Sequence, residues 1–222
     1  SLYLMTSAAF LYSLYAVFRP VLYLLRTHPH EIELARHILS RHGRSSQDFF
    51  KARPDKSFFF SADGQSFLAY RVGRGLAVVL GDPVGPAEAV EGIVRNFARF
   101  CDDNGWGVAF HQVTADYLNL YLRLGFKKLK VGDDAIVDLT QFTLEGGAGK
   151  EFRHIVNKIE KSGVHIMRYE PPIPEEVLKQ VKEVSDEWLR IPGRRERGFT
   201  LGMFEPNYIR STPLFTAADK DG

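Results

Sequence analysis

Apolar and polar residues follow two different periods along the chain, and these predict helices and strands in turn. Apolar positions at 32, 35, 38 and 39 have helical spacing, and Gly43 supplies a stop signal for that helix. Three strand-like runs follow between residues 57 and 80, with a tight hairpin turn at Asp63-Gly64. A second amphipathic helix is predicted to begin at Pro86, and a strand over residues 107–113 comes after it. Helices interleaved with strands are typical of an α/β or α+β protein.

The stretch from Asp116 to Leu139 predicts a helix followed by a pair of strands. Asp116 is a good N-cap, Gly125 can adopt the left-handed conformation that ends a helix, and the residues from Phe126 onward alternate as in a strand. A turn at residues 133–134 leads into a second predicted strand, AIVDL. This order of helix, strand, turn and strand resembles the closing unit of the GNAT acyltransferase fold. We therefore expect a GNAT-like fold, with one full unit and the start of a second.

The amino-terminal segment has a different composition from the rest of the chain. No charge occurs from Leu2 to Phe18, and the apolar character resumes after Arg19-Pro20. The run is long enough to be the last part of a membrane span, which needs about 20 residues, although its serines and tyrosines also fit a buried or amphipathic helix. Arg19 and Arg26 would hold the downstream chain on the cytoplasmic side. We expect a membrane-proximal segment (1–27), a first GNAT-like unit (28–148) and the start of a second unit (149–222).

Composition narrows the class of protein further. Apolar residues make up 45% of the chain and charged residues 25%, which is the balance of a folded globular protein. The net charge of +2 does not suggest a protein that coats nucleic acid. The single cysteine, Cys101, cannot form an intramolecular disulfide, and its position in an apolar helical pattern indicates a buried residue. No spacing of zinc ligands occurs, so we expect no metal site.

The segment before the second predicted helix bears on the acyl donor. GNAT enzymes that use acetyl-CoA carry a Gln/Arg-x-x-Gly-x-Gly/Ala loop there, whose backbone N–H groups bind a pyrophosphate. The corresponding residues here read GDPVGPAEAVEG, with two prolines, and proline has no N–H to donate. We therefore expect no CoA cofactor, although the Gly-Pro loop could still hold another group.

An ordered set of motifs extends the resemblance over about 160 residues. The motifs resemble the soluble carboxy-terminal domain of the phosphatidylglycerol lysyltransferase family, whose members are also called aminoacyl-phosphatidylglycerol synthases or multiple peptide resistance factors. In chain order they are DKSFFFSADGQSFLAYRV, AVVLGDPVGP, FHQV, YLRLGF, KVGDDAIVDL, EFRHIVNKIEKSG, SDEWL and RRERGFTLGMFEPNY.

The resemblance implies a pair of cytoplasmic GNAT-like units behind a transmembrane bundle in the bacterial inner membrane. The implied reaction transfers an aminoacyl group, lysyl being the expected one, from aminoacyl-tRNA to phosphatidylglycerol, which changes the lipid charge and gives resistance to cationic peptides. The implied partners are therefore aminoacyl-tRNA and a phosphatidylglycerol membrane, and a homo-oligomer is a further expectation. The sequence ends at FTAADKDG, inside the predicted second unit, so we expect part of the aminoacyl-binding site to be missing from this chain.

A predicted basic helix over residues 150–161 carries candidate substrate-binding residues. Its cations either form a solvated face or bind the phosphates of a lipid or of tRNA. Lys158 and Lys161 are three residues apart and share a helix face, whereas Arg153 lies about 140° from Lys158 and should meet a different partner. The candidates on this helix are Arg153, Asn157, Lys158 and Lys161.

The RRERGF motif and the Gly-Asp-Pro turn carry the remaining candidates. Glu196, a lone glutamate among arginines, is either an ion-pair partner or, as the resemblance implies, a catalytic residue near the acceptor cavity, with Arg195 and Phe199 binding substrate beside it. Asp82 is either a turn residue or a catalytic residue that positions substrate. Trp188, on an apolar helical stripe, is expected in the core.

Aminoacyl transfer from tRNA needs no protein nucleophile, because the ester is already activated. The chain accordingly contains no recognisable Ser/His/Asp motif, an absence that many non-enzymes share. Three hypotheses remain: an aminoacyl-tRNA:phosphatidylglycerol transferase domain, a GNAT acyltransferase with CoA or another small donor, and a non-catalytic membrane-binding fragment.

Overall fold

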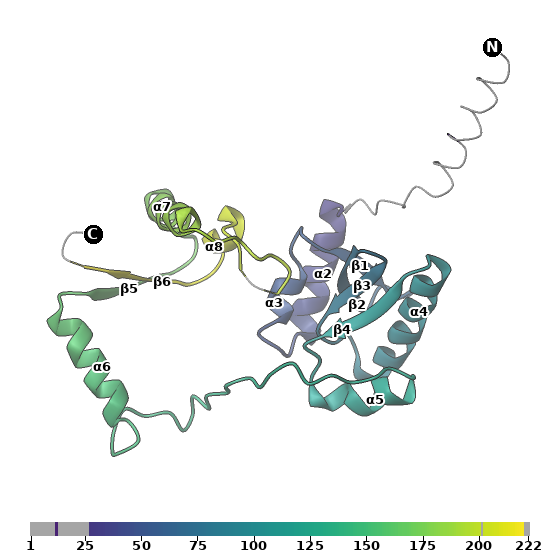
Figure 1. Cartoon of the computed structure of the whole chain (residues 1–222), viewed down its shortest axis with the longest axis horizontal. Helices are drawn as coiled ribbons and strands as arrows, with labels where there is room; N and C mark the ends of the chain where they lie inside the picture. Colours follow the sequence, from purple (N-terminus) through teal and green to yellow (C-terminus); the bar gives the residue numbers. More distant parts are fainter. Residues whose placement is uncertain (1–11, 13–26, 201, 220–222) are drawn as a thin grey trace, which may run out of the picture. The chain divides into compact units, whose positions relative to one another are not determined.

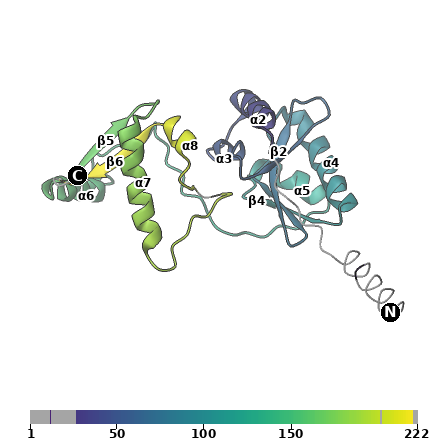
Figure 2. The same cartoon turned by 90° about the horizontal axis from the view of Figure 1, so that it is seen from above.

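The computed structural model describes residue 12 and residues 27–200 and 202–219, and the chain in it divides into two compact units (Figures 1 and 2). The division falls after Lys127, so the units comprise residues up to 127 and from 128 onward. The sequence instead predicts a boundary after residue 148, so the two divisions assign residues 128–148 to different units. The sequence-based boundary stays a prediction. The apolar amino-terminal segment lies outside the described residues, apart from residue 12. Among the described residues, no helix has both the length and the apolar character to cross a membrane.

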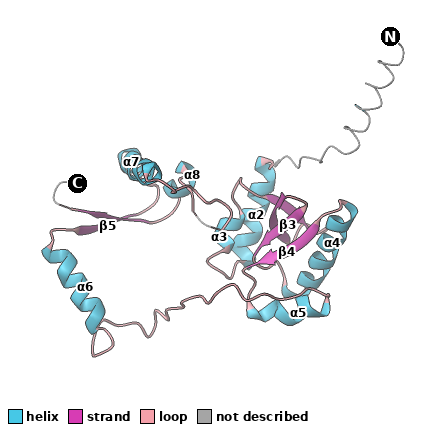
Figure 3. Cartoon of the chain, viewed as in Figure 1, coloured by secondary structure: helices cyan, strands magenta, loops and turns pink. Residues whose placement is uncertain are grey.

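A mixed sheet forms the centre of the first unit (Figure 3). Strands β1 (Ser57–Phe60), β2 (Phe67–Gly73) and β3 (Leu76–Leu80) pair in antiparallel fashion, and β4 (Gly107–His111) is added parallel to β3. The parallel connection requires a crossover, which the short helix η1 (Ala87–Ala89) and α4 (Val90–Asp103) supply. After β4 come η2 (Ala115–Tyr117) and α5 (Leu118–Arg123). The predicted order of helices and strands up to Gly125 is confirmed.

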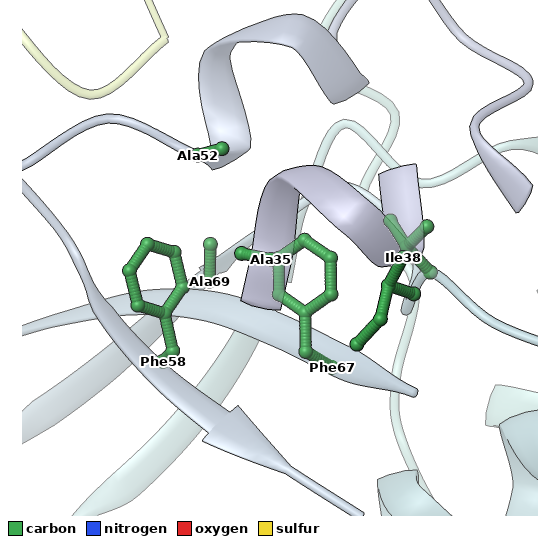
Figure 4. Packing of buried hydrophobic residues seen from close by; sticks show 7 residues of the cluster. Ala35, Ile38, Ala52, Phe58, Phe67 and Ala69 are labelled. Atoms are coloured by element: carbon green, nitrogen blue, oxygen red, sulfur yellow. The ribbon is translucent and has the colours of Figure 1, made fainter. Parts of the chain in front are cut away.

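Helices cover both faces of this sheet because alternate residues of β2 point to opposite sides. Phe67 and Ala69 face the helices α2 (Pro29–His42) and α3 (Asp48–Lys51), where Figure 4 shows them beside Ala35 and Ile38. Leu68 and Tyr70 face α4 in a second cluster with the buried side chains Ala77, Val79, Ile93, Phe97 and Cys101. Cys101 is fully buried, which confirms the predicted buried cysteine, and this burial raises the pKa of its thiol to about 11.

The predicted pair of strands over residues 126–139 is wrong for this structure. Residues 126–138 have no regular secondary structure, and Leu129 and Ile136 are 85% and 90% exposed. The alternation of apolar residues gives a segment strand propensity, but a strand forms only where a neighbouring strand supplies hydrogen bonds. No such neighbour pairs with this segment among the described residues.

The second unit is built around a two-stranded sheet and a small core. Strands β5 (His165–Tyr169) and β6 (Leu214–Ala218) pair in antiparallel fashion. Helix α7 (Glu175–Arg190) contributes Val177 and Leu178 to the core, and α8 (Pro206–Arg210) contributes Ile209. Helix α6 (Lys150–Lys161) precedes the sheet and has no buried residue.

Candidate functional site

The loop between α7 and α8 forms a pocket within the second unit. Its cavity volume is about 600 Å³, which is in the range of pockets for small molecules. The lining combines apolar side chains with the three arginines and the glutamate of the RRERGF motif. The residues that line it are Val181, Ser185, Trp188, Gly193, Arg194, Arg195, Glu196, Arg197, Gly202, Met203, Phe204 and Ile209. An apolar surface beside arginines and a carboxylate can bind an amphiphile that carries a phosphate and a hydroxyl group.

Glu196 is held in place by the main chain of the same loop. Its Oε1 atom accepts a hydrogen bond from the Phe204 N–H group at 2.7 Å, which ties the two sides of the pocket loop together. No ion pair to Glu196 occurs among the described residues, so its interpretation as an ion-pair partner of the neighbouring arginines is not supported in this structure. The second carboxylate oxygen accepts no hydrogen bond from the described residues. One oxygen therefore orients the carboxylate, and the other can accept a proton.

Trp188 is a functional candidate that sequence reasoning missed. We expected this residue in the core, but its side chain is 42% exposed and lines the pocket. The first turns of α7 bury Val177 and Leu178, whereas the last turns extend beyond that small core. The Arg194 guanidinium carbon lies 5.3 Å from the centre of the Trp188 ring, within the range of a cation–π contact. A tryptophan just before a Pro-Gly turn and an arginine cluster is the sequence signal that indicates this position.

The candidates on α6 do not line this pocket. Arg153 donates hydrogen bonds through Nη1 to the carbonyl groups of Leu144 and Gly146, the latter at 2.9 Å. Its partner in this structure is therefore the preceding loop, and the acceptor phosphate that the sequence suggests for this arginine stays a prediction. Lys158, Lys161 and Asn157 are exposed. The assignment of these four residues to substrate binding stays a prediction.

The candidates near the pocket are Arg195, Glu196 and Phe199. Arg195 and Glu196 lie together in the pocket lining, and their roles in binding and catalysis stay predictions. Phe199 belongs to the same loop and has a positive φ of 74°, but its side chain is not part of the lining.

Asp82 belongs to the first unit, where its buried carboxylate is the acceptor of a hydrogen-bond network that extends from the buried Tyr121 to the exposed Thr114. Oδ2 accepts hydrogen bonds from the N–H and hydroxyl groups of Thr114, at 2.9 and 2.8 Å, and Oδ1 accepts one from the Tyr121 hydroxyl at 2.9 Å. Burial, followed by the Asp82 charge, raises the pKa of Tyr121 above its ordinary value. These bonds connect the end of β3 to the loop after β4 and to α5. The catalytic assignment of Asp82 stays a prediction.

A buried lysine supports the same turn from the other side. The Lys51 ammonium group donates to the main-chain oxygen of Asp82 and forms an ion pair of 2.6 Å with Asp48. Burial alone would raise the pKa of Asp48, but the Lys51 charge and hydrogen bonds from Lys51, Arg44 and Ser45 lower it overall. We refer to Asp48, Lys51, Asp82, Thr114 and Tyr121 together as the Asp82 network.

The turn at residues 81–86 has few free N–H groups with which to bind an anion. The Gly81 N–H group donates to the His111 carbonyl at 2.7 Å, and the Val84 N–H group donates to the Phe67 carbonyl at 2.8 Å. Pro83 and Pro86 have no N–H. The N–H groups that would bind a pyrophosphate are therefore already used or absent at four of these six positions. Among the described residues, no group of three or more His, Cys, Asp or Glu side chains could hold a metal ion.

The fold and the pocket define the class of protein. Antiparallel strands followed by a helical crossover to a parallel strand, with helices on both faces, give the mixed architecture of a GNAT-like transferase fold. The family model described as "Phosphatidylglycerol lysyltransferase, C-terminal" matches residues 36–222. The chain belongs to this family.

Relatives and solved structures agree with the family. The phosphatidylglycerol lysyltransferase of Staphylococcus epidermidis is 32% identical over 195 residues, and that of Staphylococcus aureus is 33% identical over 183 residues; these matches cover 88% and 82% of this chain. The chain spans only 23% and 22% of those two proteins. The structure of L-PGS from Bacillus licheniformis matches with a TM-score of 0.77 and 32% identity, covering 86% of this chain and 58% of that one. A putative lysylphosphatidylglycerol synthetase domain from Agrobacterium fabrum matches with a TM-score of 0.81 and 29% identity, covering 86% and 60%.

Proposed function

We propose that this chain contributes to the transfer of a lysyl group from lysyl-tRNA to phosphatidylglycerol, at the cytoplasmic face of the bacterial inner membrane. The observation that carries the proposal is the pocket of the second unit, which joins apolar side chains to arginines and one oriented glutamate. The name of the family, phosphatidylglycerol lysyltransferase, supports the choice of acceptor. The product would be a cationic lipid in place of an anionic one, and resistance to cationic peptides would follow from that change.

The pocket chemistry fits the acceptor lipid. Met203, Phe204 and Ile209 offer apolar surface to the glycerol backbone and the first methylene groups. Arg195 can bind the phosphate through paired N–H donors, and a guanidinium group suits this geometry better than an ammonium group does. The terminal hydroxyl of the headgroup would then lie toward Glu196.

The reaction then needs two proton transfers, one from the lipid hydroxyl and one to the ribose oxygen of the tRNA. Glu196 accepts the proton of the lipid hydroxyl while that oxygen forms a bond to the lysyl ester carbonyl carbon. The bond from this carbon to the ribose oxygen of the tRNA breaks, and the ribose oxygen takes the proton back from Glu196. A neighbouring guanidinium stabilises the negative charge that develops on the carbonyl oxygen. Lys158 and Lys161, exposed on α6, would bind the tRNA backbone.

Other donors and roles are less well supported. The turn at residues 81–86 offers few N–H groups for a pyrophosphate, which supports a donor other than CoA. A non-catalytic membrane-binding fragment would bind the lipid without turnover. A homo-oligomer stays a prediction.

Binding of soluble short-chain phosphatidylglycerol tests the pocket. The chain has two tryptophans, of which Trp188 lines the pocket and Trp106 belongs to the core of the first unit, so a titration can be followed by tryptophan fluorescence. We expect Arg195→Gln to weaken binding by roughly 10-fold, because a hydrogen bond to a charged group is lost. Arg190→Gln is the matched control, since Arg190 is exposed and does not line the pocket.

Two outcomes would count against this assignment. Equal affinities of the Arg195 and Arg190 variants would show that the lipid phosphate does not bind to Arg195 in this pocket. Equal affinity of the unchanged chain for short-chain phosphatidylcholine would show that the headgroup is not recognised.

A further inference from the structure

The turn that leads into the RRERGF motif fixes the main chain of Arg194. This turn spans residues 191–194, and its Gly193 is left-handed with a φ of 81°. Pro192 and Gly193 at its centre are the residues typical of a type II turn. The Arg194 N–H group donates a hydrogen bond to the Ile191 carbonyl at 3.0 Å, and the Ile191 N–H group donates to the Trp188 carbonyl at 3.2 Å. Two consecutive main-chain bonds therefore connect Arg194 to the end of α7.

The side chain of Arg194 is held by the ring of Trp188. Its guanidinium carbon lies 5.3 Å from the centre of that ring, and both side chains line the pocket. A cation at this distance over an aromatic face is attracted by the negative charge density of the ring. Arg194 is therefore restrained both at its main chain and at its charged end.

The other arginines of the pocket lack such supports. In the part of the chain that the structure describes, the side chains of Arg195 and Arg197 have no hydrogen bond, ion pair or ring contact. A long side chain that is not held loses rotamer freedom when it binds a ligand, and this loss costs free energy. The guanidinium groups in the pocket lining therefore differ in how far they are ordered before a substrate arrives.

The proposed reaction places two negative charges in the pocket at different times. The phosphate is charged from the moment the lipid binds, so it can order a mobile guanidinium such as that of Arg195. The carbonyl oxygen of the ester becomes an anion only in the transition state. A donor that stabilises this charge is most effective when it is already oriented, because no reorganisation then accompanies the reaction. Arg194 is the arginine of the pocket lining that meets this requirement.

We propose that Trp188 is a positioning residue that holds the Arg194 guanidinium toward the carbonyl oxygen of the aminoacyl ester. Arg194 is then the catalytic cation, whereas Trp188 does not touch the reacting atoms. Glu196, the proposed base, follows two residues after Arg194 and is oriented by the Phe204 N–H group, so one loop supplies both groups. The catalytic role rests on the proposed function, but the restraint of Arg194 by Trp188 can be measured without any transfer reaction.

Nuclear magnetic resonance of the chain tests the restraint. Relaxation of the arginine side-chain Nε–Hε groups reports their motion on the ps–ns timescale. We expect a higher order parameter for Arg194 than for Arg197, and a decrease at Arg194 in Trp188→Leu. Trp188→Phe should retain most of the restraint, since a phenyl ring also attracts a cation to its face. Val184→Ala is the matched control, because Val184 is exposed on the same helix and does not line the pocket.

A double-mutant cycle tests the catalytic role. The enzyme is the Staphylococcus epidermidis relative with this chain in place of its matching residues. We expect Arg194→Gln to lower kcat by about 10²–10³-fold, as removal of an oxyanion donor does, and Trp188→Leu to lower it roughly 5-fold, as loss of an exposed cation–π contact does. The KM for phosphatidylglycerol should be nearly unchanged, because the interaction is made in the transition state. In the Arg194→Gln background, Trp188→Leu should have no further effect on kcat.

Several results would overturn the proposal. Equal order parameters at Arg194 and Arg197, a comparison made in the unchanged chain, would show that Arg194 is not restrained. The same conclusion would follow if Trp188→Leu left Arg194 unaffected, or if Trp188→Phe lowered its order as much as Trp188→Leu.

The kinetic results can overturn it in two further ways. A Trp188→Leu effect on kcat that persists in the Arg194→Gln background would indicate a general structural defect, and a raised KM with unchanged kcat would assign Trp188 to lipid binding. If the enzyme without these substitutions transfers no lysyl group, the proposed function fails, and the relaxation measurement still decides whether Trp188 restrains Arg194.

Discussion

Asp82 illustrates how one side chain can connect several segments of a fold. Its carboxylate receives three hydrogen bonds, and the donors lie 32 and 39 residues further along the chain. The side chain is 9% exposed, so water cannot readily replace a lost partner. A carboxylate that is already engaged by three donors of its own chain is well suited to hold a turn in place.

Replacement of Asp82 separates a structural role from a catalytic one. Asp82→Ala leaves the Thr114 N–H group and the Tyr121 hydroxyl without their acceptor, so we expect the free energy of unfolding to fall by about 2–4 kcal/mol. Urea unfolding measures this loss, with Asp103→Ala as the control at an exposed position of the same unit. Unchanged stability together with lost lysyl transfer would instead support the catalytic assignment.

At the scale of elements, α6 brings together a structural arginine and two exposed lysines. Arg153 connects the first turn of the helix to the loop at residues 144–146, whereas Lys158 and Lys161 occupy its last turn. Cations at the end of a helix also favour its dipole. The two groups of cations should therefore respond differently to substitution.

Binding of tRNA at several salt concentrations tests this difference. Lys158→Ala with Lys161→Ala should weaken tRNA binding and reduce the slope of log affinity against log salt by about 1.5, because two phosphate contacts are lost. Arg153→Ala should reduce lysyl transfer while tRNA binding persists. Lys179→Ala with Arg190→Ala, at exposed positions on α7, is the control. Equal, mild effects of all three changes would mean that α6 presents only a solvated surface.

The sequence predicts elements well where the signal is local. The period of the apolar residues placed α2, the three strands between residues 57 and 80, α4 and β4, and the turn at Asp63-Gly64 has the expected left-handed glycine with φ 67°. The strands expected over 126–139 are absent because a strand depends on a neighbour that the local sequence does not specify. The burial of Trp188 was misjudged because the size of the core around α7 is a property of the whole unit.

The candidate site could be predicted only in part for the same reason. The RRERGF motif placed Arg195 and Glu196 together, and both line the pocket. The bond from the Phe204 N–H group to Glu196 spans eight residues of irregular loop, and the bonds to Asp82 cross between separate elements. Such contacts follow from the folded path of the chain, which periodicity does not reveal.

At the scale of the whole molecule, the two units are suited to different tasks. The first has helices on both sheet faces and a turn whose N–H groups are largely used by its own chain. The second has a smaller core and contains the pocket with its arginines and oriented glutamate. We therefore expect the chemistry in the second unit and a supporting role for the first.

Transfer of radiolabelled lysine from lysyl-tRNA into extracted lipid tests this account most directly. The enzyme is the Staphylococcus epidermidis relative with this chain in place of its matching residues, because the chain alone spans only 23% of that protein. With phosphatidylglycerol as acceptor we expect labelled lipid from this chimera, at least 100-fold less label from its Glu196→Gln variant because a general base contributes about 10²–10⁴-fold, and near-normal label from Glu187→Gln, an exposed glutamate outside the pocket. Phosphatidylcholine should remain unlabelled. Label that is unchanged in Glu196→Gln, or equal labelling of phosphatidylcholine, would contradict the account.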